Sequence, residues 1–335
     1  MFLTSSFHCS IRRSFAAQRG MKYSLATQSL LGIFTLTTPM MSTTATTTGS
    51  SASQNCLAPE TKQFYPVLKN EKVSSDSHIL TIGLPENRAL LGWEENIPTC
   101  ISVAANNESL VVAKAKSYSP ISHPNLKGEF QLLVKAYPPQ EDGKMGVGAY
   151  ICGLQEGDVM EAKVKKPRQM HSSPHVLGRW KHVGLVAGGT GIAPLYQILV
   201  LLMSAQELNC KIHILSINRK QEDILLKSQL DQFAKEHPDV VSVTYSLTGN
   251  EDDENSPQFL MGRGTVQLAK QALPDPSLDD VMILVCGKNG FVEHWAGKVG
   301  RGPPKPDGSK GPKIQGPLLG VLNDAGYSAS QVFKY

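Results

Sequence analysis

A glycine-rich turn near the middle of the chain has the residue types of a nucleotide-binding loop. In GLVAGGTGIAPLYQIL, residues 184–199, an apolar run leads into Gly-Gly-Thr-Gly, and apolar residues resume at helical spacing after Pro194. A strand, a glycine turn and a helix in this order aim backbone N–H groups at an anion. No lysine follows as in G-x-x-x-x-G-K-[ST], and Pro194 stands where G-x-G-x-x-G has its third glycine. The turn therefore predicts an anionic ligand but matches neither of these nucleotide fingerprints.

Two earlier stretches supply groups that could hold a flat, phosphate-bearing ligand. KSYSPIS, residues 116–122, ends an extended segment with a cation, a tyrosine and a hydroxyl. GKMGVGAYICGL, residues 143–154, is a glycine turn that leads into a helical pattern. A cation beside a helix N-terminus can bind a pyrophosphate, and a tyrosine ring can lie against a flat ring. Each stretch alone is also typical of an ordinary strand or turn, so its meaning depends on the fold.

The elements that must position these groups fall into two halves. Between residues 57 and 173, β-branched or alternating segments are separated by Gly, Pro and Asn, which predicts an antiparallel barrel or sandwich. The expected strands are residues 78–84, 100–105, 109–119, 129–137 and 158–164. From residue 181 onward, strands at 182–187, 211–217, 240–247 and 281–287 alternate with helices at 193–206, 223–236 and 264–272. Such alternation predicts a doubly wound parallel sheet with a nucleotide site at the carboxyl ends of its strands.

The composition argues against a nucleic-acid-binding or zinc-binding protein. Residues 1–59 hold four basic residues and no acid, and these account for the whole formal net charge of +4. The remainder is formally neutral, so we expect no basic surface for nucleic acid. The six cysteines form no C-x-x-C pair and no clustered Cys/His spacing, so we expect neither a metal site nor a disulfide framework.

Residues 1–56 are interpreted as a targeting leader rather than as part of the fold. They are rich in Ser and Thr, carry arginines and contain no acid, which is the composition of a mitochondrial or plastid transit peptide. We expect a mitochondrial location, with a plastid as the alternative. Residues 24–41 carry no charge but are interrupted by Thr, Ser and Gln, so they predict at most a weak membrane association or anchor.

The order of these features resembles the ferredoxin–NADP reductase superfamily, and within it the NADH–cytochrome-b5 reductase branch. That branch carries R-x-Y-[ST], G-x-x-S, G-G-T-G-[IL]-[TA]-P and C-G-x-x-x-[MF], followed by a C-terminal aromatic residue. The chain has KSYS at residues 116–119, GKMG at 143–146, GGTGIAP at 188–194, CGKNGF at 286–291 and QVFKY at 331–335. EDILLKSQLDQF, residues 222–233, matches the helix after the second α/β strand. The resemblance covers residues 60–335.

The resemblance implies an FAD-binding β-barrel at residues 57–175 and an NAD(P)-binding α/β domain at residues 176–335. The chain would be an oxidoreductase that takes hydride from NADH, with NADPH as the alternative. The residues implied in FAD binding are Lys116, Tyr118, Ser119, Tyr137, Gly143, Lys144, Met145 and Gly146. Those implied in NAD(P) binding are Gly188, Gly189, Thr190, Gly191, Pro194, Cys286, Gly287 and Phe291, of which Thr190 and Cys286 would lie beside the reacting rings. Phe333 or Tyr335 would shield the flavin face.

Hydride transfer needs the alignment of two flat rings more than it needs an acid or a base, because the cofactors carry the chemistry. The lack of a catalytic triad is therefore expected. Two positions depart from the branch. Lys116 stands for its arginine, which keeps the charge but loses the bidentate fork, and Gly146 stands for its serine. These departures predict weaker FAD binding within an unchanged fold.

The choice of nicotinamide cofactor depends on charges near the ribose. NADH users of this branch commonly carry an acid after the third α/β strand, where this chain has Thr248. Arg219 and Lys220 follow the second strand and could pair with a 2′-phosphate, or they could be solvated surface cations. We expect NADH to be preferred, with NADPH or dual use left open.

We expect the electron acceptor to be a separate haem protein of the cytochrome b5 type. The nine histidines form no H-P-G-G haem signature. The Pro/Gly-rich segment 300–317 carries four cations, Arg301, Lys305, Lys310 and Lys313, against one acid, Asp307. This segment is either a surface that steers an acidic haem protein or a solvated connection.

Two other functions remain open at this point. The same fold could serve haem attachment to cytochrome c in mitochondria, and an acceptor screen would separate that role from cytochrome b5 reduction. A flavin-free assembly protein with a degenerate barrel is favoured by Lys116 and Gly146 but opposed by the retained GGTGIAP and CG motifs. Flavin content would decide this second alternative.

Overall fold

The computed structural model describes residues 62–85, 100–105, 115–123, 125–165, 179–204, 209–249 and 259–335. All of them belong to one compact unit, Ser51–Tyr335. The leader expected at residues 1–56, the anchor at 24–41 and the domain boundary after residue 175 lie outside the described residues. Within the described ranges, none of the helices combines the length and the apolar character that a membrane span requires.

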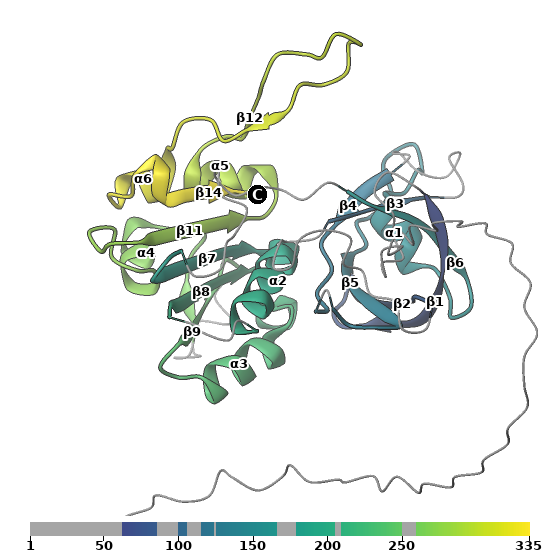
Figure 1. Cartoon of the computed structure of the whole chain (residues 1–335), viewed down its shortest axis with the longest axis horizontal. Coiled ribbons are helices and arrows are strands. Elements are labelled where there is room, and N and C mark those ends of the chain that lie inside the picture. Colours follow the sequence, from purple (N-terminus) through teal and green to yellow (C-terminus); the bar gives the residue numbers. More distant parts are fainter. Residues whose placement is uncertain are drawn as a thin grey trace, which may run out of the picture. The chain divides into compact units, whose positions relative to one another are not determined.

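The first half is a six-stranded antiparallel sheet in the order β4-β3-β6-β1-β2-β5 (Figure 1). Its elements are β1 (Gln63–Lys72), β2 (Ser77–Gly83), β3 (Ile101–Ala104), β4 (Ala115–Tyr118), β5 (Glu129–Lys135), α1 (Val147–Cys152) and β6 (Val159–Val164). A bridge between Pro120 and Leu132 joins the chain after β4 to β5, so the two edge strands meet and the sheet closes. Helix α1 contributes Val147 and Ile151 to the core inside. The predicted FAD-type barrel is confirmed.

The second half is a six-stranded parallel sheet in the order β10-β9-β8-β7-β11-β14. Its strands are β7 (His182–Gly188), β8 (Lys211–Asn218), β9 (Val241–Leu247), β10 (Leu260–Met261), β11 (Val281–Cys286) and β14 (Val332–Lys334). Its helices are α2 (Ile192–Met203), α3 (Lys227–Glu236), α4 (Val266–Ala272), α5 (Asn289–Ala296) and α6 (Gly320–Asp324). Helices α2 and α3 pack in one core cluster and α4, α5 and α6 in another, so both faces of the sheet are covered. This arrangement confirms the predicted doubly wound domain.

Two elements differ from the expectation in ways that have physical causes. The helix expected from Asp223 begins only at Lys227, because Leu226 adopts a left-handed conformation with φ of 58°. Ile224, Leu225 and Leu226 are instead drawn into the core as an irregular turn. Strand β1 was not expected, since its apolar alternation is interrupted by Pro66 and only Tyr65 and Val67 point inward.

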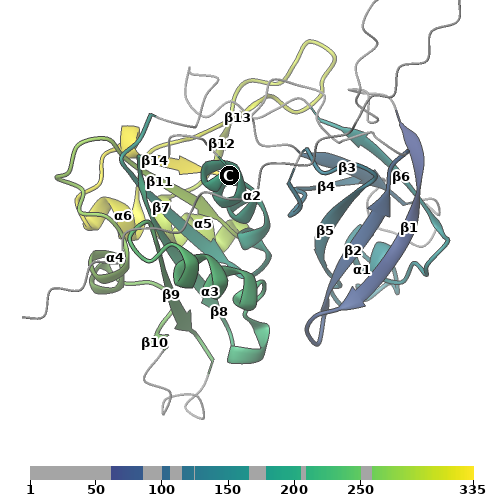
Figure 2. The ribbon, with the colours of Figure 1, turned by 60° about the horizontal axis from the view of Figure 1, so that its bottom comes forward.

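The cationic segment 300–317 forms a hairpin of β12 (Gly300–Arg301) and β13 (Lys313–Ile314), which Figure 2 shows beside β14. Its base is tied to β14. The backbone N–H of Lys334 donates to Gln315 Oε1 at 2.7 Å, and the buried Lys334 ammonium donates to the carbonyl of Pro317 at 2.8 Å. Burial lowers the pKa of Lys334. The hairpin is therefore held next to the C-terminal residue, Tyr335.

Candidate active site

Two adjoining cavities lie where the carboxyl ends of β7, β8, β9 and β11 face the barrel residues of β4 and β5. One has a volume of 760 Å³ and the other of 960 Å³, a size suited to nucleotide-sized ligands. They share a wall made by Lys135, Tyr137, Thr190, Lys288 and Gly290. A ligand in one cavity would therefore meet a ligand in the other at this wall.

Most of the residues implied by the sequence motifs line these cavities. The first cavity is lined by Lys116, Tyr118, Ser119, Tyr137, Thr190, Gly191, Pro194, Cys286, Gly287 and Tyr335. The second is lined by Tyr137, Gly188, Gly189, Thr190 and Phe291. Gly143, Lys144, Met145, Gly146 and Phe333 line neither of them. The structure thus brings the barrel motif and the two α/β motifs together, with Thr190 where the cavities join.

The glycines of the α/β motifs have separate structural reasons. A Cβ on Gly191 would lie 2.1 Å from the carbonyl oxygen of Cys286, so the turns after β7 and β11 touch through their backbones. A Cβ on Gly188 or Gly287 would lie 2.7 Å or 2.6 Å from the ring of Phe291, which packs between them. Gly189 has a φ of 53° and open space beside it. Of these four glycines, Gly189 is the one that leaves room for a ligand to approach its backbone.

Tyr118 carries the observation that tests whether the first cavity fits a flavin nucleotide. Its hydroxyl is buried and has no hydrogen-bond partner among the described residues. Burial raises the pKa of Tyr118, so the hydroxyl is protonated and able to donate. A buried polar group without a partner costs free energy, which a ligand oxygen would relieve. The ring and hydroxyl of Tyr118 therefore fit a flat ligand that carries hydrogen-bond acceptors, as FAD does.

Two lysines flank the ring of Tyr137 at the shared wall. The ammonium of Lys288 lies 4.5 Å from the ring centroid, and that of Lys116 lies 5.7 Å from it. Both lysines line the first cavity, and cation–π contacts hold their ammonium groups against the ring. The wall where the two cavities meet is consequently positively charged, which suits phosphate groups on either side.

The turn before α1 lies outside the lining of both cavities, so its contact with FAD would be made by a part of the ligand that extends beyond the first cavity. The ammonium of Lys144 lies 3.5 Å from Asp142, and the backbone N–H of Lys144 donates to the same carboxylate at 3.0 Å. Gly146 is the N-cap of α1, with an extended backbone and no side-chain cap. Two of the groups that the motif would offer to a pyrophosphate are therefore engaged by Asp142.

Gly146→Ser is expected to tighten FAD binding without disturbing the barrel. A Cβ at Gly146 would meet no atom within 4 Å, and its φ of −77° suits any residue. The new hydroxyl restores the serine of the branch, and one hydrogen bond to FAD corresponds to about a tenfold lower Kd. Fluorescence titration of apoprotein with FAD measures the Kd. An unchanged Kd with an unchanged melting temperature would show that this turn does not contact FAD.

The two C-terminal aromatic residues have different environments. Phe333 is buried in the core of the α/β domain, whereas Tyr335 is half-buried and lines the first cavity. Their rings pack edge to face with centroids 5.3 Å apart. Of the two candidates for covering a flavin, Tyr335 is the one that the structure places at the cavity.

No role was assigned from the sequence to several residues that line the cavities. Leu133 and Lys135 on β5, Cys100 before β3, and Ala193 and Asn289 at the starts of helices line the first cavity. Lys288 occupies a variable position of the CGKNGF motif, so the motif alone gives it no role. Asp76, Arg219 and Asp223 line the second cavity, and only Arg219 had been singled out. Asp223 follows the second α/β strand. In many dinucleotide-binding domains an acidic residue near this place binds the ribose hydroxyls of NAD.

Two family models match the two halves of the chain. Residues 65–168 match the oxidoreductase FAD-binding domain, and residues 185–296 match the oxidoreductase NAD-binding domain. The matches confirm FAD and NADH as the cofactors. They favour the FAD-binding function over the flavin-free alternative, because the matched FAD-binding domain contains Lys116 and Gly146 despite both departures.

Relatives and solved structures agree with these matches. An NADH-cytochrome b5 reductase-like protein of Arabidopsis thaliana is 35% identical over 72% of this chain and 67% of that relative. NADH-cytochrome b5 reductase 1 of Lodderomyces elongisporus is 35% identical over 71% of this chain and 74% of its own length. The cytochrome b5 reductase domain of Ulva prolifera nitrate reductase has the same fold, with a TM-score of 0.64 and 20% identity over 84% of this chain and all of that one.

The motifs, the two-domain fold and the sequence relatives lead to one assignment. The resemblance stated from the five motifs is confirmed. The chain belongs to the NADH-cytochrome b5 reductase family of the ferredoxin–NADP reductase superfamily, and it is an FAD-dependent oxidoreductase that uses NADH.

Proposed function

We propose that the first cavity binds the flavin end of FAD, that the second binds NADH, and that the enzyme passes single electrons to a cytochrome b5-type haem protein. The observation that carries this proposal is the shared wall of the two cavities, with Thr190 in it and the unpartnered Tyr118 hydroxyl nearby. The names of the relatives, which are NADH-cytochrome b5 reductases, support the choice of acceptor.

The residues of this chain would act by binding and orienting rather than by acid–base chemistry. When bound, FAD supplies the conversion of a two-electron donor into single-electron transfers. Tyr118 and Ser119 hold the ligand of the first cavity from the barrel, and Lys116 faces its phosphates. Thr190 and Cys286 line the first cavity from the α/β domain, and Tyr335 limits access of water to it. The contact of Gly191 with Cys286 sets the spacing of the two turns and hence of the two ligands.

The hairpin of β12 and β13 is proposed as the docking surface for the acidic haem protein. Arg301, Lys305, Lys310 and Lys313 are exposed on it, and its base is bonded to Lys334, next to Tyr335 in the first cavity. A cluster of positive charges near a reaction site raises the rate of association with a negatively charged partner. The hairpin therefore lies where it can steer an acidic acceptor to the cavity.

Reversing the charges at the tip of this hairpin is expected to slow acceptor reduction selectively. Lys305→Glu with Lys310→Glu should lower kcat/KM for cytochrome b5 at low ionic strength about tenfold and flatten its salt dependence, because steering contributes that much or more. Stopped-flow reduction of the flavin by NADH should stay unchanged. Cytochrome c and a neutral quinone serve as alternative acceptors in the same assay.

A matched control carries the same charge change elsewhere. Lys235→Glu with Lys270→Glu reverses two exposed cations on α3 and α4. This variant should reduce cytochrome b5 at the wild-type rate. Equal loss in both variants would indicate a net-charge effect, and no loss in the hairpin variant would show that the hairpin is only a solvated connection.

We further propose that residues 1–56 direct the protein to mitochondria. Support comes from the Ser/Thr-rich, acid-free composition and from Arg12, Arg13 and Arg19. A fluorescent protein fused after residue 56 should localise to mitochondria, and replacing the three arginines by glutamine should release it. Accumulation in plastids or at another membrane would contradict the mitochondrial location.

A further inference from the structure

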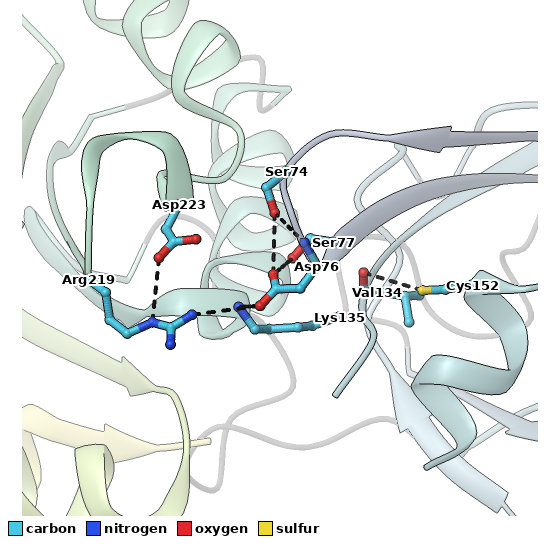
Figure 3. Close-up of polar contacts among 8 residues, drawn as sticks. All are labelled: Ser74, Asp76, Ser77, Val134, Lys135, Cys152, Arg219 and Asp223. Carbon is cyan, nitrogen blue, oxygen red and sulfur yellow. Dashed lines mark hydrogen bonds and ion pairs between the residues drawn. The ribbon is translucent and has the colours of Figure 1, made fainter. Parts of the chain in front are cut away.

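Arg219 lies at the end of β8 on the wall of the second cavity, between two carboxylates (Figure 3). Its Nε lies 3.5 Å from Oδ2 of Asp223, and its Nη2 lies 3.7 Å from Oδ2 of Asp76. Asp223 follows Arg219 on the same loop, whereas Asp76 comes from the turn between β1 and β2 of the barrel. The Arg219 side chain is 68% exposed, and it is nevertheless within ion-pair distance of both carboxylates.

The two carboxylates are held in place independently of Arg219. The side chain of Asp223 is only 12% exposed and lies at the end of a short helical turn, Gln221–Asp223. Asp76 accepts hydrogen bonds from Ser77 at 3.0 Å and from Ser74 at 3.4 Å, and it pairs with Lys135 at 2.6 Å. Burial opposes the ionisation of Asp76, but the bonds from Lys135 and Ser77 outweigh it, so its pKa is lowered. Asp76 is therefore a fixed negative charge.

Arg219 follows the second strand of the parallel sheet, a place from which many doubly wound domains distinguish the two nicotinamide cofactors. In doubly wound nucleotide-binding domains, an acid after the second strand binds the ribose 2′-hydroxyl of NAD, and an arginine nearby accommodates the 2′-phosphate of NADP. Both residue types occur here, on one loop after β8. The backbone N–H of Gly249 donates to the carbonyl of Arg219 at 2.7 Å, so the neutral Thr248 is held beside the same loop.

The lining of the second cavity has two more cations than carboxylates. Its lining holds the cations Lys135, Arg219, Arg263 and Lys288 and the carboxylates Asp76 and Asp223. Lys135 and Arg219 pair with these carboxylates, whereas Arg263 and Lys288 have no carboxylate partner within the described ranges. The two remaining positive charges match the two negative charges of one pyrophosphate. Among the described lining residues, a third phosphate would find no further cation without a carboxylate partner.

We propose that Asp223 and Asp76 set the preference for NADH over NADPH by holding Arg219 in ion pairs where a 2′-phosphate would bind. Asp223 would also accept a hydrogen bond from the ribose 2′-hydroxyl of NADH. The inference rests on the proposed binding of NADH in the second cavity. It assigns part of the specificity to the barrel, because Asp76 lies outside the nucleotide-binding domain.

The test compares two probes, 5′-AMP and 2′,5′-ADP, by isothermal titration calorimetry of the full-length, FAD-loaded protein. The wild-type protein should bind 5′-AMP more tightly. Asp223→Asn makes Arg219 available, so we expect it to tighten 2′,5′-ADP binding about threefold, the worth of one ion pair near a surface. The ratio of kcat/KM for NADPH to that for NADH should rise in parallel. Adding Arg219→Ala to Asp223→Asn should remove the gain.

The matched control changes a neighbouring carboxylate outside the cavity. Glu222→Gln removes the partner of Lys220, which lies 3.8 Å away, and the Glu222 side chain is 72% exposed. This variant should leave both affinities unchanged, so an equal gain would reveal a general charge effect and overturn the proposal. Asp76→Asn is the second variant and should shift the ratio in the same direction as Asp223→Asn.

The outcomes separate the inference from the function on which it rests. Wild-type binding of 5′-AMP and reduction by NADH, together with unchanged 2′,5′-ADP affinity in both Asp223→Asn and Asp76→Asn, would overturn the inference alone. A wild-type protein that binds neither nucleotide probe and is not reduced by NADH would overturn the proposed function and the inference with it.

Discussion

The Gly191→Ala protein is expected to be reduced by NADH about 100-fold more slowly or worse, because a misplacement of about 1 Å at a reacting centre costs that much. A methyl group on Gly191 would lie 2.1 Å from the carbonyl oxygen of Cys286 and 2.7 Å from the backbone nitrogen of Gly287. The turns after β7 and β11 must therefore separate. Stopped-flow absorbance under anaerobic conditions measures the rate, and the flavin content of the purified protein is measured alongside.

Gly148→Ala is the matched lesion in the other half of the chain. A Cβ on Gly148 would lie 2.5 Å from the carbonyl oxygen of Lys135, so α1 must move away from β5. We expect this variant to lose FAD and about 1–3 kcal/mol of stability through overpacking. The two variants should thus differ in what they lose. Gly191→Ala slows reduction by NADH, whereas Gly148→Ala weakens the binding of FAD. Wild-type reduction of Gly191→Ala by NADH would contradict the role given to the contact between the turns.

The second large effect is expected at Tyr118. Removing its hydroxyl in Tyr118→Phe should raise the Kd for FAD about tenfold, the worth of one hydrogen bond. Tyr118→Ala also removes the ring, and the two losses together should raise the Kd about 100-fold. Because the hydroxyl of Tyr118 has no partner among the described residues, Tyr118→Phe should leave the apoprotein equally stable or make it slightly more stable. Titration of apoprotein with FAD and a thermal melt measure the two quantities.

Tyr150→Phe provides the comparison for Tyr118→Phe. Tyr150 lies on α1 of the same barrel, is half-buried and lines neither cavity. Its substitution should leave the Kd for FAD unchanged. If Tyr118→Phe bound FAD as tightly as the wild-type protein, the buried hydroxyl would not be a ligand contact.

The sequence predicted most accurately those strands whose apolar pattern follows directly from their burial in a sheet. The apolar strands β7, β8, β9 and β11 lie within a residue or two of their predicted positions, because central parallel strands are apolar along their whole length. The order of five motifs was enough to identify the family, and most of their residues line the two cavities. The strands of the barrel were equally visible where alternation was regular, as in β5 and β6.

Other features could not be read from the sequence because they depend on contacts between distant residues. Asp76 belongs to the short polar turn SSDS, and nothing local shows that it meets Arg219. Six glycines of the motifs were assigned to ligand binding, yet three of them, Gly188, Gly191 and Gly287, are also required by packing against Phe291 or Cys286. The sequence left Phe333 and Tyr335 as equal candidates for covering the flavin, and nothing local shows that Val332 and Phe333 are buried in β14 beside β11.

The central claim is that one chain aligns NADH with a bound flavin across the wall shared by the two cavities. Its most direct test is the absorbance spectrum of the purified full-length protein under anaerobic conditions, before and after one equivalent of NADH. We predict a yellow protein whose flavin absorbance bleaches on mixing and returns when an oxidised acceptor is added. A colourless protein that does not take up added FAD, or a flavin spectrum that NADH leaves unchanged, would contradict the claim.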